Sequence, residues 1–293
     1  MNRITTIALM LTGPAMLHAQ DDLATEMCSL VERSGVVMGI AVHDLGTGRQ
    51  FFWNEEEMFH AASTMKTPVM IEVYRQASAG QYSLEDSVVV KNEFRSIVDS
   101  SVYSMDLGDD SDDSMYGLLG RRTTIRHLVE QMITVSSNLA TNILIDLVGS
   151  GNVTATMRQL GAPDIQVLRG VEDDKAYELG LNNRTNALDL MTIFAALAEG
   201  KAVNETADSA MIEVLLRQKF NDKIPALLPP GVRVAHKTGN ITGIEHDSGV
   251  LLLPDGSKIV MVILTRGWKD QRRAKDDMAF IAQRLFLGFT EGR

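Results

Sequence analysis

The chain has 293 residues, of which 45% are hydrophobic and 23% charged, and its formal net charge is −10. This composition is typical of a folded globular protein and excludes a disordered chain or a collagen-like repeat, while the length predicts one large domain or two interlocked lobes. Because the negative charge repels a phosphate backbone, we expect no nucleic-acid partner.

Cysteine and histidine usage argues against disulfide and metal chemistry. Cys28 is the single cysteine, so the chain cannot form an intrachain disulfide or a site of several thiolates. The histidines show no close ligand pair of the His-x-His or His-x-x-x-His kind. We therefore expect no metal and no cofactor. The six are His18, His43, His60, His127, His236 and His246.

The N-terminus has the pattern of an export signal. Arg3 supplies a positive charge, residues 4–17 are mostly apolar, and Ala19 places a small residue before an expected cleavage site. A buried N-terminal helix is the alternative interpretation. The stretch is short and is interrupted by Gly13-Pro14, and no later run reaches membrane-spanning length. We expect residues 1–19 to be removed and a periplasmic or secreted protein without stable membrane insertion.

Strand patterns lie near both ends of the mature chain, and helical patterns lie between them. After a helical pattern at 22–34, residues 36–42 and 49–53 predict a hairpin. Apolar residues three and four apart predict helices at 64–78, 124–134, 139–148, 186–199 and 207–219. Strands are predicted at 232–236, 248–253 and 258–265, and a final helix at 270–287.

These patterns predict an α/β (α+β) fold with two lobes. Hairpins at the two ends can pair only if the ends meet in one antiparallel sheet. We therefore expect a single domain over residues 20–293, with a mixed lobe from 20–62 and 218–293 and an inserted helical lobe from 63–217. A crevice between the lobes is the natural ligand site.

One acidic segment, 106–113, invites a calcium interpretation. It lacks the alternating ligands and the terminal glutamate of a calcium loop, so a solvated surface loop is the preferred interpretation.

Ser63 and Lys66 stand three residues apart at the start of a predicted helix, which puts both side chains on one face. A desolvated lysine can act as the base that activates a serine hydroxyl, and a helix N-terminus adds free N–H groups nearby. Taken alone, Ser63 is better interpreted as a helix cap and Lys66 as a solvated charge.

A second motif, Ser136-Ser137-Asn138, lies between two helical patterns. Ser136 could relay a proton, and the Asn138 amide could hold a substrate or Lys66. The plainer interpretation is that a serine caps the next helix. A similar triplet at 150–152 follows a glycine and contains another, so we predict a turn there.

The third motif is Lys237-Thr238-Gly239, at the end of a predicted strand. Lys237 supplies positive potential, the Thr238 hydroxyl can bind a carboxylate, and Gly239 leaves room for close approach at a strand edge. A strand end followed by a turn is the alternative.

In order and spacing, the three motifs together resemble the serine β-lactamase and penicillin-binding-protein superfamily, most closely the class A β-lactamases. The resemblance covers nearly all of the mature sequence. It departs from the family pattern at Ser137, where the family usually has aspartate.

The resemblance implies the roles of the motif residues. Ser63 would be acylated by a β-lactam carbonyl, with Lys66 as base and Ser136 as proton relay. Substrate binding would involve Asn138, Asn182, Lys237, Thr238 and Gly239, and the backbone N–H groups of Ser63 and Asn240 would form an oxyanion hole.

Deacylation requires a glutamate that activates water, and two candidates remain. Glu178 lies four residues before Asn182, which is the spacing of the family, and we favour it because Asn182 would help to hold the water. Glu172 follows Arg169, where the family often has an arginine. Both could also be solvated loop acids.

The arginine that pairs with the substrate carboxylate in many class A enzymes is missing, since His246 stands there. Arg272 or Arg273 could replace it, although a surface position is the preferred interpretation. The leading hypothesis is a monomeric, exported serine hydrolase that opens β-lactams. The alternatives are a D,D-peptidase or esterase that accepts acyl-D-Ala-D-Ala-like substrates, and a sensor that binds β-lactams without hydrolysing them.

Overall fold

The computed structural model describes residues 25–291 apart from 27, 30–31 and 34. The expected export signal at 1–19 lies outside the described residues, as does much of the predicted helix at 22–34. Within the part of the chain that is described, none of the helices is both long and apolar enough to cross a membrane.

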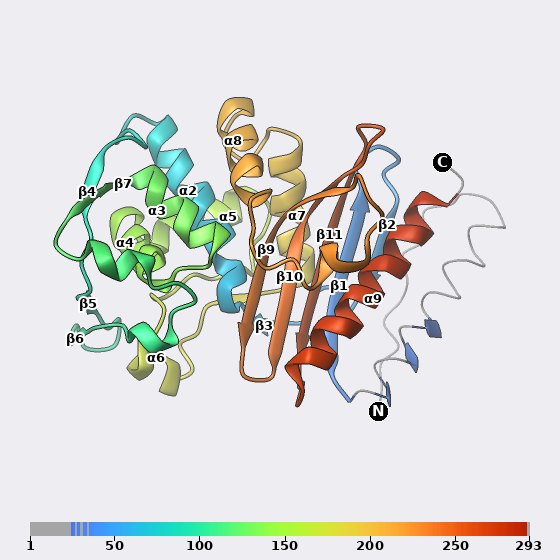
Figure 1. Ribbon diagram of the computed structural model, residues 1–293, viewed down its shortest axis with the longest axis horizontal. Helices are drawn as coiled ribbons and strands as arrows, with labels where there is room; N and C mark the ends of the chain where they lie inside the picture. Colours follow the sequence, from blue (N-terminus) through green and yellow to red (C-terminus); the bar gives the residue numbers. More distant parts are fainter. Residues whose placement is uncertain (1–24, 27, 30–31, 34, 292–293) are drawn as a thin grey trace.

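A five-stranded antiparallel sheet joins the two ends of the chain (Figure 1). Its strand order is β2-β1-β11-β10-β9, so the C-terminal hairpin adds directly to the N-terminal strands, as the pattern predicted. β9 forms one edge of this sheet. The strands are β1 (Val37–Asp44), β2 (Gln50–Trp53), β9 (Arg233–Ile241), β10 (Ile244–Leu252) and β11 (Lys258–Arg266).

Both faces of the sheet are buried, which explains the nearly continuous apolar runs in its strands. On one face, Met38, Ile40 and Ile263 pack against α9 (Gln271–Thr290), the helix at the right of Figure 1. The opposite face belongs to the larger core, which also contains α7 (Ala187–Ala198). α7 lies in the segment predicted to form the helical lobe, yet it packs against β1, β10 and β11.

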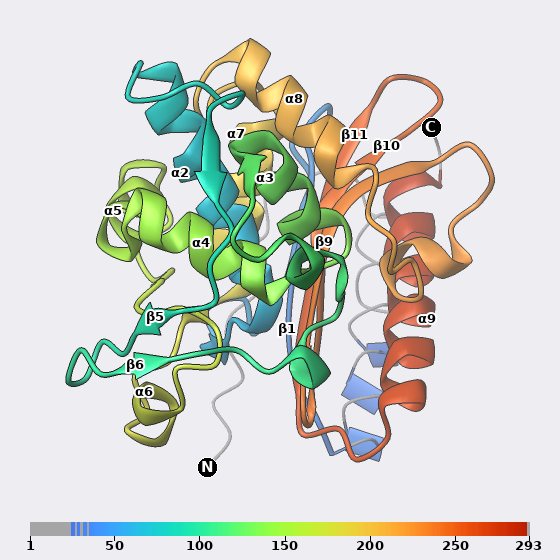
Figure 2. The ribbon, with the colours of Figure 1, turned by 60° about the vertical axis from the view of Figure 1, so that its left-hand side comes forward.

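The other long helices gather beyond α7 on the side away from α9 (Figure 2). They share the larger core with one face of the sheet, so the two lobes have a continuous apolar interior. These helices are α2 (Lys66–Ser78), α3 (Ile125–Thr134), α4 (Asn138–Val148), α5 (Ser150–Gln159) and α8 (Glu205–Leu215).

Short elements connect these helices and bring the loops to the site. Three two-stranded pairs form, β3 with β8, β4 with β7 and β5 with β6. The short strands are β3 (Phe59–His60), β4 (Ser87–Val89), β5 (Phe94–Arg95), β6 (Val102–Tyr103), β7 (Arg122–Thr124) and β8 (Arg184–Thr185). The short helices are η1 (Ala62–Met65), η2 (Leu107–Asp109), η3 (Ser114–Leu118), α6 (Asp174–Glu178) and η4 (Ile224–Leu227).

Two local predictions were wrong. The triplet at 150–152 begins α5 and is not a turn. The chain reverses one residue earlier, at Gly149, whose φ of 79° a residue with a side chain rarely adopts. The third motif does not end a strand, because β9 continues to Ile241 and pairs with β10 along its whole length.

Candidate active site

The candidate nucleophile lies on a short 3-10 helix immediately before α2. Ser63 is half-buried in η1, and the backbone N–H of Lys66 donates to the carbonyl of Ser63. Ala62, just before it, has a φ of 45°, a costly backbone conformation for an alanine. The surrounding structure therefore holds Ser63 in a fixed, strained turn between the sheet and α2.

The Lys66 side chain is completely buried and points to the second motif. Its ammonium donates to the carbonyl oxygen of Ser136 at 2.6 Å, to Ser136 Oγ at 3.1 Å and to Asn138 Oδ1 at 2.8 Å. Among the described residues, no hydrogen bond joins this ammonium to the Ser63 hydroxyl. The second motif thus fixes the position of the Lys66 ammonium, and Lys66 itself lies one helical turn after Ser63.

Ser136 connects the two lysines of the site. Its hydroxyl lies 3.1 Å from Lys66 Nζ and 3.0 Å from Lys237 Nζ. Its φ of 62° is a second left-handed conformation at the site. A hydroxyl between two amines is suited to relaying a proton, because it can accept from one and donate elsewhere.

The edge strand β9 faces η1. Lys237 and Thr238 are buried, Asn240 is exposed, and Lys237 Nζ also donates to the carbonyl of Thr238 at 2.9 Å. A Cβ added to Gly239 would lie 3.0 Å from the backbone nitrogen of Ser63. The absence of a side chain at Gly239 is therefore what allows β9 to approach η1 so closely.

Burial changes the protonation of both lysines. It lowers the pKa of Lys66 to about 7, although the negative charges of Asp110 and Glu172 oppose the change. Burial, together with the positive charges of Lys66 and Lys223, lowers the pKa of Lys237 well below its usual value. A lysine with a pKa near neutrality can accept a proton, as a base for a serine hydroxyl must.

A loop from residue 168 to residue 183 closes one side of the site, and Asn183 joins its ends. Asn183 Oδ1 accepts from the backbone N–H of Leu168 at 2.8 Å and of Arg169 at 3.1 Å, and Nδ2 donates to the carbonyl of Arg169. On α4, Asn142 brackets Val171 in the same way, with bonds to its N–H and its carbonyl. These amides fix the path of the loop up to Glu172.

The loop brings Glu172, and not the favoured Glu178, to the site. Glu172 Oε1 accepts from Asn138 Nδ2 at 3.2 Å, and Oε2 accepts from the backbone N–H of Asp106 at 3.2 Å. Glu178 is exposed at the end of α6. Asp173 caps that helix by accepting from the backbone N–H of Ala176. The preference for Glu178 over Glu172 is not supported by this geometry.

Asn182 has a different surrounding from the one expected. Its Oδ1 accepts from Arg169 Nη2 at 2.8 Å, and Arg169 also donates to the carbonyls of Gly170 and Leu181. Arg169 thus links the first part of the loop, at Gly170, to its last part, at Leu181 and Asn182. Asn182 contributes to that link, and the hydrogen bond to Glu172 comes from Asn138.

None of the expected substitutes for the carboxylate-binding arginine faces the site. His246 is buried, and its Nε2 lies 2.9 Å from the carbonyl oxygen of His60. Arg272 and Arg273 are exposed at the start of α9, on the face of the sheet opposite the larger core, and Arg273 lies 3.5 Å from Asp277.

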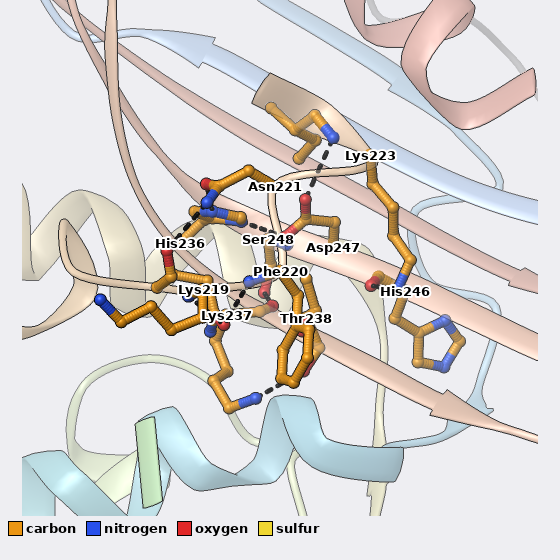
Figure 3. A network of polar contacts seen from close by, with 12 residues as sticks. Lys219, Phe220, Asn221, Lys223, His236, Lys237, Thr238, His246, Asp247 and Ser248 are labelled. Carbon is orange, nitrogen blue, oxygen red and sulfur yellow. Dashed lines mark hydrogen bonds and ion pairs between the residues drawn. The ribbon is translucent and has the colours of Figure 1, made fainter. Parts of the chain in front are cut away.

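A buried polar network lies behind Lys237, between β9, β10 and the segment before η4 (Figure 3). His236 Nδ1 lies 2.8 Å from Asp247 Oδ1, and His236 Nε2 lies 3.1 Å from Asn221 Oδ1. Lys223 forms an ion pair with Glu245 at 2.7 Å. Since all but one of these side chains is buried, the network fixes the segment before η4 to the sheet.

Three residues of the site were not identified from the sequence. Asn142 lies four residues after Asn138 on α4, so helical spacing could have placed it on the same face. Asn183 is adjacent to Asn182 and offered no separate signal. Asp110 lies in the acidic segment interpreted as a solvated loop, yet its carboxylate accepts from the backbone N–H of Asn138 at 2.8 Å. That interpretation was therefore wrong for Asp110.

Within the described residues, no group of three histidine, cysteine, aspartate or glutamate side chains could hold a metal ion. What the arrangement offers is a serine, a buried lysine of lowered pKa, a bridging hydroxyl and a hydrogen-bonded carboxylate. Such a set can carry out acyl transfer and hydrolysis.

Comparison with known proteins gives a consistent result. The chain is 25% identical to a β-lactamase of Streptomyces albus G over 260 residues, which cover 87% of this chain and 80% of that protein. It is 23% identical to the extended-spectrum β-lactamase PER-1 of Pseudomonas aeruginosa, over 90% of this chain and 86% of that one.

Solved structures share the fold. A β-lactamase of Sphaerobacter thermophilus has a TM-score of 0.78 and 28% identity, with 92% of this chain and 96% of that chain covered. The structure of PBP-A has a TM-score of 0.77 and 22% identity, with 93% and 96% covered, which supports the fold alone. The model of the beta-lactamase enzyme family matches residues 21–287. The chain therefore belongs to this family and is a serine β-lactamase.

Proposed function

We propose that this protein hydrolyses β-lactams through an acyl-enzyme on Ser63 and that Glu172 activates the deacylating water. The observation that carries the second part is the chain of hydrogen bonds from Lys66 through Asn138 to Glu172. Membership of the family supports the first part.

In the acylation step, Ser63 Oγ bonds to the lactam carbonyl carbon and the ring C–N bond breaks. Neutral Lys66 takes the hydroxyl proton, and Ser136 passes a proton from the resulting ammonium to the departing lactam nitrogen, so that Lys66 is neutral again. Lys66 is suited to this because, at a pKa of about 7, its neutral form is well populated at neutral pH. Lys237 and Thr238 bind the substrate at the β9 edge, and the N–H groups of Ser63 and Asn240 stabilise the oxyanion.

In the deacylation step, water attacks the ester carbonyl carbon and Glu172 takes its proton. The ester C–O bond breaks, and the departing Ser63 Oγ receives that proton, so that Glu172 is again a carboxylate. The two hydrogen bonds at 3.2 Å hold both oxygens of Glu172 in place. A fixed carboxylate beside a buried lysine is a suitable general base, since it needs no reorganisation when the proton moves.

The test compares wild type with Glu172→Gln and with the matched control Glu178→Gln. Wild type and the control should turn over nitrocefin at the same rate, whereas Glu172→Gln should be slower by about 100-fold or more. After penicillin G, intact-mass spectrometry should find a long-lived adduct of the whole penicillin mass on Glu172→Gln alone.

Other outcomes would contradict the proposal. An adduct that accumulates only on Glu178→Gln would reassign the base. Stable acylation of the wild type without turnover would indicate a D,D-peptidase or a sensor. A wild type that is neither labelled nor active would exclude the acyl-enzyme on Ser63.

We also propose export, on the basis of the N-terminal sequence pattern alone. Cell fractionation and N-terminal sequencing of the mature protein test it. A start near Gln20 in the exported fraction would support the proposal, and an intact Met1 in the cytoplasm would refute it.

A further inference from the structure

The acidic segment contributes one carboxylate to the start of α4. Asp110 Oδ1 accepts from the backbone N–H of Asn138 at 2.8 Å, and Oδ2 accepts from that of Leu139 at 2.9 Å. These are the first two residues of the helix, whose N–H groups have no partner within it. The carboxylate therefore satisfies two orphan donors and places a negative charge at the positive end of the helix dipole.

The contact between Asp110 and α4 lies next to Ser137, the position at which the chain departs from the family pattern. Ser137, where the family usually has aspartate, caps α4 with its own hydroxyl, which accepts from the N–H of Ala140 at 3.3 Å and lies 3.5 Å from Asp110 Oδ2. In this chain the carboxylate next to the N-terminus of α4 therefore comes from Asp110, which lies 27 positions before Ser137 in the sequence.

Asp110 is itself held from a second side. The hydroxyl of Tyr116, on η3, donates to Asp110 Oδ2 at 3.3 Å. Together with the two backbone donors of α4, this contact fixes the carboxylate between two helices. A side chain held by three groups has little freedom to leave the site.

The same carboxylate influences Lys66. Burial is the largest effect on the pKa of Lys66, and the negative charge of Asp110 is the largest effect that opposes it, ahead of Glu172. Lys237, on β9, binds the other side of Ser136 Oγ, and the positive charge of Lys66 lowers the pKa of Lys237. Asp110 therefore favours the ammonium that Asn138 Oδ1 and Ser136 bind.

We propose that Asp110 is a positioning residue for acylation, which fixes the N-terminus of α4 and so holds Ser136 and Asn138 against Lys66. It acts through these residues and does not touch the substrate. The inference rests on the acyl-enzyme proposed above, because acylation is the step it concerns.

The experiment uses the full chain in excess over penicillin G, and rapid-quench mass spectrometry follows the transient adduct on Ser63 in single turnovers. Asp110→Ser removes the carboxylate, and the double variant Asp110→Ser/Ser137→Asp restores one at the neighbouring position. Asp110→Asn keeps an acceptor but removes the charge. The control is Asp113→Asn, an exposed residue of the same segment whose side chain caps nothing.

We expect Asp110→Ser to be acylated about tenfold more slowly, because small displacements of reacting groups cost up to about 100-fold. The double variant should recover most of the rate. In Asp110→Asn, the pH midpoint of acylation should fall, because loss of the negative charge lowers the pKa of Lys66. The control should match wild type in both respects.

The proposal is overturned if Asp110→Ser and Asp110→Asn acylate at the wild-type rate with an unchanged pH midpoint. It is also overturned if the rate of Asp110→Ser falls only in parallel with its folded fraction and Ser137→Asp does not restore it. A wild type that neither forms this transient adduct nor consumes penicillin G refutes the acyl-enzyme itself, which is a different result.

Discussion

The buried pair of His236 and Asp247 offers a direct test of what supports the third motif. Asp247 Oδ1 lies 2.8 Å from His236 Nδ1 and accepts from the backbone N–H of Ser248 at 3.0 Å. Oδ2 accepts from the backbone N–H of Ile224 at 3.1 Å. Asp247→Ala would therefore leave two buried N–H groups and one imidazole without this partner.

The magnitude follows from these contacts. An unsatisfied buried donor costs about 1–3 kcal/mol, and removing one partner of a buried pair costs about 3–5 kcal/mol in total. At about 2–4 °C per kcal/mol for a chain of this size, the melting temperature should fall by about 10 °C. Asp247→Asn keeps one acceptor, so its loss should be smaller.

Thermal unfolding monitored by circular dichroism measures the effect. The matched control is Asp222→Ala, in the segment before η4, where Asp222 forms a half-exposed ion pair with Lys275. Such pairs contribute about 0–1 kcal/mol, so this control should melt near wild type. An Asp247→Ala protein within ~1 kcal/mol of wild type would refute the view that this pair fixes β9 and β10.

Three further predictions concern the site and its frame. The neutral form of Lys66 accepts the proton, and its pKa is about 7, so the acylation rate in single turnovers should rise with pH with a midpoint near that value. A rate that is flat from pH ~6 to ~8 would contradict the role of Lys66 as base. Gly249→Ala would put a Cβ 2.4 Å from the carbonyl oxygen of Ala235, so the free energy of unfolding of this variant should fall by about 3 kcal/mol or more in denaturant titrations. In the control Gly117→Ala the new Cβ meets no atom within 4 Å, so the free energy of unfolding should stay close to that of wild type. Asn183→Ala removes the hydrogen bonds that join the ends of the loop carrying Glu172, so the deacylation rate should fall by about tenfold while the acylation rate stays close to that of wild type. Equal losses in both rates would show that the loop does not act on deacylation alone.

Local patterns in the sequence were sufficient for the sheet and the main helices. Alternation and apolar runs placed β1, β2 and β11 within a few residues of their observed bounds, and the paired ends followed because isolated hairpins cannot bury their faces. The three motifs, around Ser63, Ser136 and Lys237, were weak signals one by one and were recognised by their order and spacing, which resemble those of a known family. The sequence by itself therefore determined the sheet, the main helices and the principal polar side chains of the site.

The tertiary structure alone decided which carboxylates reach the site. Glu172 and Glu178 lie six residues apart in one loop, and sequence spacing favoured Glu178. The loop is held by Asn183 and Asn142 through backbone hydrogen bonds that no local pattern encodes, and these bonds direct Glu172 toward Asn138.

The position of Asp110 also depends on the tertiary structure, and here the contacts join residues farther apart in the sequence. Its segment is acidic and mostly exposed, which is typical of a solvated loop, and its bonds to the N-terminus of α4 depend on how η2, η3 and α4 pack. Propensity and periodicity describe a residue by its neighbours in the chain. A carboxylate that satisfies donors on a distant helix is determined only when the chain has folded around it.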